Sequence, residues 1–355
     1  MSNKSTGSGD VISSSRRQYL KATGAAVTTA SLAGCGAIGG GGSDFPNKDM
    51  TIVVPSPPGG GFSNIGEVII PYLEEELSGN NSISLDHTVG GGGLAATEKV
   101  WGADPDGHTI LFMYTNQTVI GDLYMDSGFN PREFGYLGII SEDPYSLLGR
   151  RDTNISDWED FVDRIGEFNF ATQGVGTNGH IDILVIGVLT NSFGVGDLNF
   201  THYEGSGPAA QALASGEADF LGQTAPGTFS DAQSFESIEM VFTFAERDEK
   251  GEKFAPQSRF FLEDIPANDI QQAVEPTNFP RFFATPPGVD DDQLGTLRSA
   301  FEAVLDNDEF RSEVENVHMI TSPSVGGERI NTIIDSQYNT YQSDPFASIL
   351  REALA

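Results

Sequence analysis

The chain has 355 residues, 38% of them hydrophobic and 10% aromatic, which is enough for more than one compact domain. Its formal net charge is −32, from 51 acidic and 19 basic residues, so no basic face can form and nucleic acid is excluded as a partner. The 24 phenylalanines argue against a disordered acidic chain. We interpret the acid excess as a halophilic surface, because a Debye length of ~3 Å at molar salt screens its self-repulsion.

The first residues of the chain predict an export signal. Arg16 and Arg17 precede an apolar stretch at 22–33, which is too short to cross a bilayer core that requires ~20 apolar residues. A basic segment, a short apolar segment and small residues after it are typical of a signal peptide. The paired arginines indicate the Tat export route.

A lipid anchor is predicted directly after this signal. The segment Leu32-Ala33-Gly34-Cys35 resembles a lipobox, and Cys35 is the only cysteine, so an intramolecular disulfide is excluded. We expect residues 1–34 to be a Tat signal peptide with lipobox and residues 35–45 to be a flexible glycine-rich tether. The mature chain would then be lipid-anchored at the outer face of the cell membrane, without a transmembrane helix.

Strand and helix patterns alternate in the rest of the chain. Predicted strands lie at 50–54, 83–85, 109–113, 136–140, 146–149, 169–172, 199–203 and 240–244. Predicted helices lie at 65–77, 94–101, 182–193, 208–215, 291–307, 308–316 and 326–354. This alternation implies parallel sheets with right-handed crossovers, and the length suggests two such lobes.

Three of the expected strand-to-helix junctions are rich in glycine and contain no lysine or arginine. They lie at 55–64, 89–94 and 174–180. The first turn of a helix leaves backbone N–H groups unpaired, and glycine lets a ligand approach them closely. Such junctions bind carboxylate, sulfate or phosphate without a cationic side chain. The three loops therefore predict an anion site at the carboxyl ends of the strands.

The third loop leaves an alternative open. Gly174, Gly176 and Gly179 match the pattern G-x-G-x-x-G, and Glu204 ends the next strand. This pattern is typical of a dinucleotide site. The loop lies mid-chain, and Glu204 is farther away than the usual ~20 residues. An exported nucleotide-dependent oxidoreductase that uses residues 174–179 is therefore one alternative, and an exported hydrolase is another.

An ordered series of motifs from residue 45 to the end resembles a known family. The motifs are Val54-Pro55 with Gly59-Gly60-Gly61, Asp86-His87-Thr88-Val89-Gly90-Gly91-Gly92-Gly93, Pro105-Asp106-Gly107-His108-Thr109-Ile110-Leu111, Gly174-Val175-Gly176-Thr177 with His180, Tyr203-Glu204-Gly205-Ser206-Gly207-Pro208-Ala209, Ser215-Gly216-Glu217-Ala218-Asp219 and Thr285-Pro286-Pro287-Gly288-Val289. They are similar to those of the extracytoplasmic solute receptors of tripartite tricarboxylate transporters, the Bug/TctC-type substrate-binding proteins.

The resemblance implies an α/β fold with two lobes that close on a ligand, a type II periplasmic-binding-protein flytrap with parallel-dominated sheets. We expect lobe I at 46–150 and 247–355, and lobe II at 151–246. The resemblance also implies the ligand contacts. The proximal carboxylate would be held by Gly59, Gly60, Gly61, Ser63, Gly92 and Gly93, and the distal part by Asn116, Thr177 and Ser206.

Some residues depart from the family pattern. Ser63 stands where the family usually has an aspartate, and Glu67 where it has an arginine. His87-Thr88-Val89 replaces an asparagine-arginine-proline segment. Without the aspartate, recognition of an amino group is in doubt, and a plain dicarboxylate or tricarboxylate is the simpler ligand.

The resemblance implies a receptor and not an enzyme. It would act as a monomer, without cofactor or metal, and would deliver a small organic anion to membrane permease subunits. The histidines show no metal-ligand spacing, and no catalytic motif is present. A sensory solute receptor without transport is a further alternative.

Overall fold

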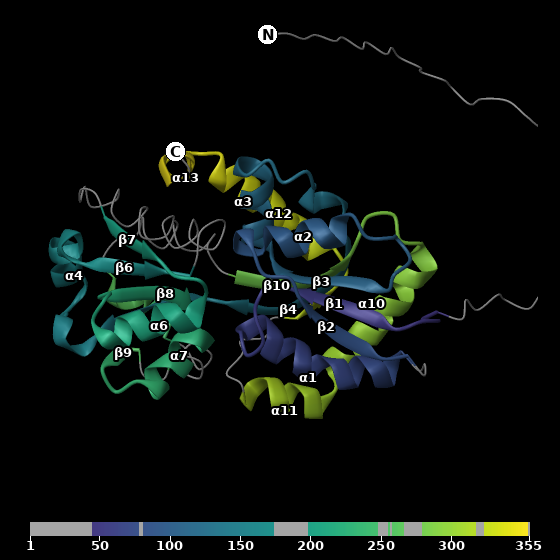
Figure 1. Ribbon diagram of the computed structural model, residues 1–355, viewed down its shortest axis with the longest axis horizontal. Coiled ribbons are helices and arrows are strands. Elements are labelled where there is room, and N and C mark those ends of the chain that lie inside the picture. The colour runs from purple at the N-terminus through teal and green to yellow at the C-terminus, as the bar shows by residue number, and fades with distance from the viewer. Residues whose placement is uncertain are drawn as a thin grey trace, which may run out of the picture. The chain divides into compact units, whose positions relative to one another are not determined.

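Two β-sheets flanked by helices make up the described part of this computed structural model, which covers residues 45–77, 81–173, 198–247, 255, 258–265, 279–316 and 323–353 (Figure 1). By its contacts, the segment Ser43–Ala355 is one unit and Met1–Gly42 another. The N-terminal unit, with Arg16, Arg17 and Cys35, lies outside the described residues. Within those ranges, no helix is both long enough and apolar enough to cross a membrane.

The first sheet has six strands in the order β11-β4-β10-β3-β1-β2. They are β1 (Met50–Val54), β2 (Ile83–His87), β3 (Thr109–Tyr114), β4 (Gly135–Asp143), β10 (Phe279–Thr285) and β11 (Ser324–Val325). β1 runs parallel to both β2 and β3, whereas β10 runs antiparallel to both β3 and β4. The sheet is therefore mixed and not dominated by parallel pairs.

Helices cover both faces of this sheet (Figure 1). One face carries α1 (Gly61–Glu76), α10 (Asp291–Asp306) and α11 (Asp308–Asn316), which pack against one another. The other face carries α2 (Leu94–Trp101), α3 (Thr115–Tyr124) and α12 (Glu328–Tyr341), followed by α13 (Phe346–Ala353). The core of this lobe is strongly aromatic. Phe112 of β3 and Phe283 of β10 stack with their ring centroids 4.1 Å apart.

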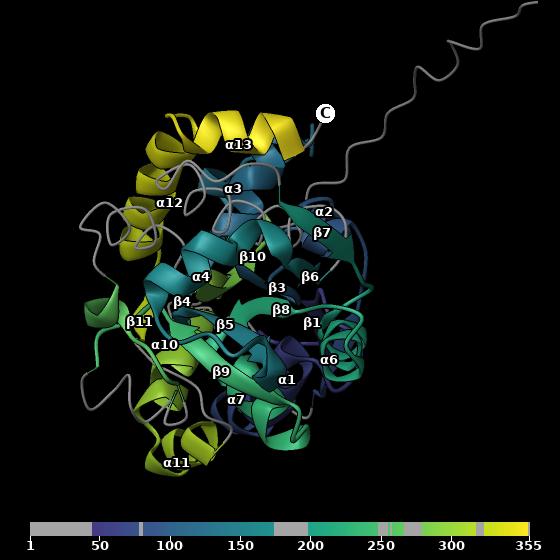
Figure 2. The same ribbon diagram turned by 90° about the vertical axis from the view of Figure 1, so that its left-hand side faces the viewer.

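The second sheet has five strands in the order β7-β6-β8-β5-β9. They are β5 (Tyr145–Arg150), β6 (Asn169–Thr172), β7 (Asn199–His202), β8 (Phe220–Thr224) and β9 (Ile238–Thr243). β6 is parallel to β7 and β8, and β5 is antiparallel to β8 and β9. One face carries α4 (Trp158–Arg164), and the other carries α6 (Ser206–Ser215) and α7 (Ala225–Ser234) (Figure 2).

Successive side chains of β8 point to opposite faces of the second sheet, and each face packs against its own helices. Phe220 packs with Phe161 of α4 in the aromatic core beneath that helix. The next residue, Leu221, points to the opposite face and packs with Leu213 of α6. Short 3₁₀ turns complete the fold at η1 (Gly91–Gly93), η2 (Pro131–Glu133), η3 (Arg151–Thr153), η4 (Ile165–Glu167) and η5 (Leu262–Asp264).

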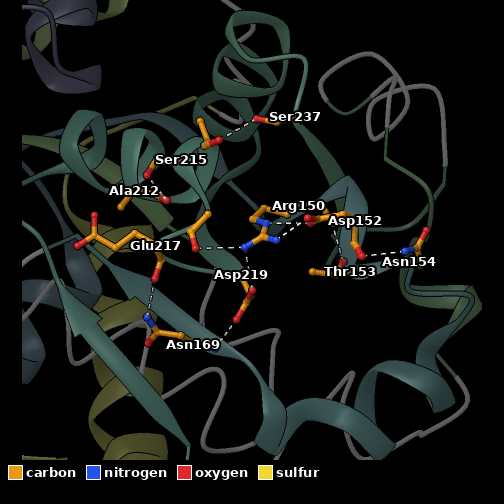
Figure 3. Close-up of polar contacts among 12 residues, drawn as sticks. Arg150, Asp152, Thr153, Asn154, Asn169, Ala212, Ser215, Glu217, Asp219 and Ser237 are labelled. Atoms are coloured by element: carbon orange, nitrogen blue, oxygen red, sulfur yellow. Dashed lines mark hydrogen bonds and ion pairs between the residues drawn. The ribbon is translucent and has the colours of Figure 1, made fainter.

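The motif at residues 215–219 closes the edge of the second sheet that carries the N-terminal ends of β6 and β8 (Figure 3). Gly216 ends α6 in the left-handed region with φ of 84°. Asp219 accepts a hydrogen bond from the Asn169 N–H at 2.9 Å and another from Arg150 Nη1 at 3.4 Å. Arg150 also forms a close ion pair with Asp152. This motif therefore joins β5, β6 and β8 at the end where the parallel strands begin.

Several predicted boundaries need correction. Residues 145–150, which we expected in lobe I, form β5 of the second sheet, so the first crossover falls at Pro144. Phe260 forms a bridge with Phe242 of β9, so residues beyond 246 also pack with the second sheet. The single helix expected at 326–354 is two helices, α12 and α13, separated by a segment with Pro345, which has no N–H for a helix ladder. The helix expected at 182–193 lies outside the described residues.

Candidate functional site

Three helices begin at the same edge of the first sheet. Because β1, β2 and β3 are parallel neighbours, their carboxyl ends lie side by side, and α1, α2 and α3 start there. In the second sheet, the parallel strands β7, β6 and β8 likewise end together, and α6 and α7 begin at that edge. Each sheet therefore gathers several helix N-termini at one edge.

The connection between β4 and β5 brings the two edges together. β4 runs in the same direction as β3, since both are antiparallel to β10, so it ends at the edge where α1, α2 and α3 begin. Only Pro144 separates it from β5, which starts at the edge where β8 ends. The side chain of Thr224, at the end of β8, lies close enough to the hydroxyl of Tyr114, at the end of β3, to lower the pKa of that hydroxyl. The helix starts of the two sheets therefore face a common junction.

The first glycine loop leads into α1. Gly60 is the N-cap residue of this helix, no side chain caps it, and its first turn has no acidic residue. Gly59 lies in the left-handed region with φ of 82°. A β-carbon on Gly60 would approach the Ser56 β-carbon to 2.9 Å, so glycine is required there by the turn itself. The helix begins with backbone N–H groups for which the described loop supplies no side-chain acceptor.

The second glycine loop has an unusual backbone. Gly90, Gly91, Gly92 and Gly93 all have positive φ, at 142°, 57°, 66° and 103°. Residues with a β-carbon rarely adopt such angles, so a run of four glycines is required for this path. Gly93 is the N-cap of α2, again without a side-chain cap or an acidic first turn.

His87 connects the two loops. Its Nδ1 donates a hydrogen bond to the Ser56 carbonyl at 2.8 Å. The N–H of Thr88 bonds to the Val54 carbonyl at 3.0 Å. The segment that departs from the family pattern thus holds the second loop against the first.

The start of α3 adds buried polar groups to this edge. Thr115, Asn116 and Gln117 are all buried, and Asn116 is fully inaccessible to solvent. The Nδ2 of Asn116 has no hydrogen-bond partner among the described residues. A β-carbon on Gly93 would lie 3.4 Å from Gln117 Oε1, which places the start of α3 beside the second glycine loop. A buried donor without a partner at this edge could donate its hydrogen bond to an acceptor on a bound ligand.

The helices of the second sheet repeat the pattern. Gly205 is the N-cap of α6, with φ of 96°, and Thr224 is the N-cap of α7. Neither helix has a side-chain cap or an acidic residue in its first turn. Ser206, the first residue of α6, is half-buried. The third glycine loop, with Thr177 and the G-x-G-x-x-G pattern, lies outside the described residues.

Helices that begin at the opposite edges are different. α4, α10 and α12 follow strands that run antiparallel to those described above, and each carries acidic residues in its first turn. Asp157 and Asp290 cap two of them by accepting N–H bonds. Acidic residues at a helix start satisfy its N–H groups and its dipole. In a chain with 51 acidic residues, their absence from α1, α2, α3, α6 and α7 leaves these starts open to an external anion.

A buried cation that no sequence motif indicates lies at this edge. Arg281 of β10 is 4% exposed and forms a close ion pair with Asp143, the last residue of β4. Its Nε and Nη2 donate to the Tyr114 hydroxyl at 2.9 and 2.6 Å. Burial raises the pKa of Tyr114 to about 12, although Arg281 opposes the rise. Burial lowers the pKa of Arg281, but Asp143 and Tyr114 outweigh it and hold the pKa above its usual value.

The predicted site residues fall into three groups. Gly59, Gly60, Gly61, Gly92, Gly93 and Asn116 lie at the edge where α1, α2 and α3 begin, and Ser206 lies at the start of α6. Ser63 is buried within α1, and its hydroxyl donates to Glu67 at 3.0 Å. Thr177 lies outside the described residues. No signal near Arg281 in the sequence connects it with the glycine loops, because the register of β10 against β3 places it there.

A depression elsewhere on the surface has the wrong charge for an anion. It has a volume of about 510 Å³ and is lined by Glu76, Asp291 and Asp292 together with small residues of α10. Its carboxylates would repel a negative ligand. Across the described ranges, no three His, Cys, Asp or Glu residues are grouped so that they could hold a metal ion.

Two α/β lobes that meet along the β4–β5 connection, with open helix starts at the edges that meet, define the two-lobe periplasmic binding-protein fold. Residues 73–334 match the family model described as tripartite tricarboxylate transporter family receptor. The chain belongs to this family.

Known relatives support the fold. A protein from Pseudomonas sp. (strain P51), described as the UPF0065 protein in the tcbD-tcbE intergenic region, is 28% identical over 182 residues, which cover 50% of this chain and 52% of that protein. The chain thus spans about half the length of the curated relatives it matches. A solved structure of Rhodopseudomonas palustris Rpa4515 with adipate has a TM-score of 0.71 at 16% identity, covering 87% of this chain and 98% of the other. MatC from the same organism with bound malate has a TM-score of 0.67 at 19% identity, covering 88% and 100%.

Proposed function

We propose that this chain is an extracytoplasmic receptor that captures a small carboxylate for a tripartite tricarboxylate transporter. It would bind the ligand between the two lobes and pass it to membrane permease subunits, without chemistry of its own. The alternatives, an exported nucleotide-dependent enzyme and a sensory receptor without transport, remain as outcomes of the tests below.

One observation carries this proposal: the distribution of acidic residues over the helix starts. The helices that begin where the two lobes meet lack acidic residues and side-chain caps, whereas α4, α10 and α12 have acidic first turns. Open helix starts bind anions through backbone N–H groups and the helix dipole. The chain as a whole is strongly acidic. Because these helix starts lack acidic residues, an anion meets less local repulsion there than elsewhere.

The carboxylate class is supported by the structural neighbours, one with malate and one with adipate. We propose that the ligand contacts are Gly59, Gly60, Gly61, Gly92, Gly93, Asn116, Thr177 and Ser206, with Ser63 contributing through its backbone. The hydroxyl of Ser63 is already bonded to Glu67, and no carboxylate replaces the aspartate of the family pattern at this position. A ligand without an amino group therefore fits this site better than an amino acid.

The membrane placement is also part of the proposal. Arg16 and Arg17 would direct Tat export, and lipid on Cys35 would hold the mature chain, as a monomer, at the outer face of the membrane. The charge of −32 would make the protein halophilic. Its unfolding temperature should then rise steeply with potassium chloride up to molar concentrations, and an unfolding temperature independent of salt would contradict that assignment.

A thermal-shift screen in molar potassium chloride tests the receptor proposal. We expect stabilisation by dicarboxylates or tricarboxylates such as malate, adipate or citrate, by about 2.7 kcal/mol at a hundredfold excess over Kd. Sodium sulfate serves as a control anion that has no carboxylate. A neutral diamide serves as a control of similar shape that has no charge. Stabilisation by NAD alone would instead favour the exported oxidoreductase. Uptake measurements in cells with and without the chain then separate transport from sensing.

A further inference from the structure

The glycine loops of the sequence predict an anion held by backbone N–H groups alone, yet the fold brings one guanidinium to the same place. Gly61, the first residue of α1, is exposed and has no side chain. A β-carbon built on it would lie 3.7 Å from Arg281 Nη2, and apart from the chain neighbours Gly60 and Phe62 and the backbone of α1 no other heavy atom would lie within 4 Å. The space above the start of α1 therefore opens directly onto this guanidinium.

The donors of Arg281 can be counted. A guanidinium has five N–H groups. Nε and Nη2 each donate to Tyr114, and Nη1 faces Ser141 at 3.4 Å and Asp143 in the ion pair. These contacts use four of the five groups. Among the described residues, the fifth N–H, on Nη2, has no partner, and Nη2 is the atom nearest the space at Gly61.

We propose that Arg281 is a ligand-binding residue that donates its fifth N–H to the carboxylate bound at the start of α1. This assignment rests on the proposed receptor function and names the cationic contact of that same site. Tyr114, Ser141 and Asp143 fix the plane of the guanidinium, so it needs no reorganisation when the ligand arrives. The ion pair with Asp143 keeps the buried cation compensated in the empty protein, which a buried charge requires.

The arrangement also explains why glycine stands at the first position of α1. The backbone at Gly61 is helical and not in the left-handed region, so alanine is allowed there and would favour the helix. A methyl group would, however, occupy the space between the ligand and Nη2. Glycine at this position therefore keeps the guanidinium accessible.

The test measures Kd for malate and adipate by isothermal titration in buffered molar potassium chloride. Gly61→Ala should weaken binding at least about tenfold, because it removes one charge-assisted hydrogen bond, and the unfolding temperature of the empty protein should not fall. Gly295→Ala is the matched control. It is also a glycine in a helix, it has open space around its β-carbon position, and it lies away from the lobe junction in α10, so its Kd should stay at the wild-type value.

A second variant tests the charge. Arg281→Gln combined with Asp143→Asn removes both charges, so no unpaired ion is left buried, and should weaken binding about ten- to a hundredfold. Unchanged Kd in this folded double variant would overturn the assignment while the receptor function stands. The same holds if only one of the two variants loses affinity. If the double variant does not fold, the Gly61→Ala result decides. If the wild-type chain binds no carboxylate at all, both the receptor function and the role of Arg281 are overturned.

Discussion

The imidazole Nδ1 of His87 lies 2.8 Å from the carbonyl oxygen of Ser56, so a side chain at the end of β2 holds the loop that follows β1. A carbonyl oxygen only accepts, so Nδ1 carries the proton. Ser56 in turn packs against Gly60, the N-cap of α1. This bond therefore makes the start of α1 depend on the second loop, although the two loops are far apart in the sequence.

Substituting His87 tests that dependence. His87→Phe keeps the ring but removes the donor, so we expect about fivefold weaker carboxylate binding and a loss of about 1 kcal/mol in the free energy of unfolding. Ser84→Ala, an exposed change on the same strand, is the control. If titration gives wild-type affinity for His87→Phe, the second loop does not position the first.

Two glycines in the left-handed region should respond differently to alanine. Gly59 has open space around its β-carbon position, so Gly59→Ala should cost about 1–2 kcal/mol from backbone strain alone. At Gly93 the new β-carbon would lie 2.0 Å from Met113 Cε in the core, which adds about 1–3 kcal/mol. Chemical unfolding of both variants measures the difference. Equal losses would mean that Met113 moves aside without cost.

Tyr114 predicts loss of stability at high pH. Burial raises its pKa from 10.0 to about 12, so the native state keeps the proton that the unfolded state loses first. The stabilising contribution is complete below about pH 10 and is lost as the pH rises through about 12, a change of about 2–3 kcal/mol. Tyr114→Phe cannot titrate and should show a shallower decline between these values. Parallel curves for the two proteins would contradict the assignment.

Asp219 should affect stability but not binding. It joins Asn169 and Arg150 at the edge opposite the helix starts (Figure 3). Asp219→Ala should lower the free energy of unfolding by about 1–2 kcal/mol, because it removes the acceptor of the Asn169 N–H and one of the acceptors of Arg150, which keeps its bonds to Asp152 and to the Gly216 carbonyl. Carboxylate affinity should remain at the wild-type value. Ser237→Ala, which removes one exposed hydrogen bond nearby, is the comparison. A change in Kd would connect this motif to the ligand after all.

Cys35 tests the membrane anchor. Cys35→Ser should move the protein from the membrane fraction to the soluble fraction, because one serine cannot accept the lipid. Ser43→Ala, in the predicted tether, should leave the fractionation unchanged. Replacing Arg16 and Arg17 with lysine should retain the chain inside the cell. A Cys35→Ser protein that still sediments with membranes contradicts the lipobox.

Local patterns were sufficient for much of the fold. The predicted ranges 94–101, 169–172 and 308–316 match α2, β6 and α11 residue for residue. Each combines a clear apolar pattern with a glycine, asparagine or acidic boundary. β8 and β10 were missed as strands. β10 holds Pro280 and Arg281, whose place in a central strand depends on neighbours far along the chain.

The acidic composition, the open glycine loops and the family motifs were readable from the sequence alone, because each depends on neighbouring residues in the chain. They predicted a two-lobed α/β fold of the receptor family, with helix starts that suit an anion. Only the tertiary structure decided what surrounds that anion. Arg281 lies 220 residues after Gly61 in the chain, and it reaches the first loop only because β10 returns from the second lobe and pairs antiparallel with β3 and β4. Strand register across such a separation depends on packing of the whole sheet, which no local pattern records.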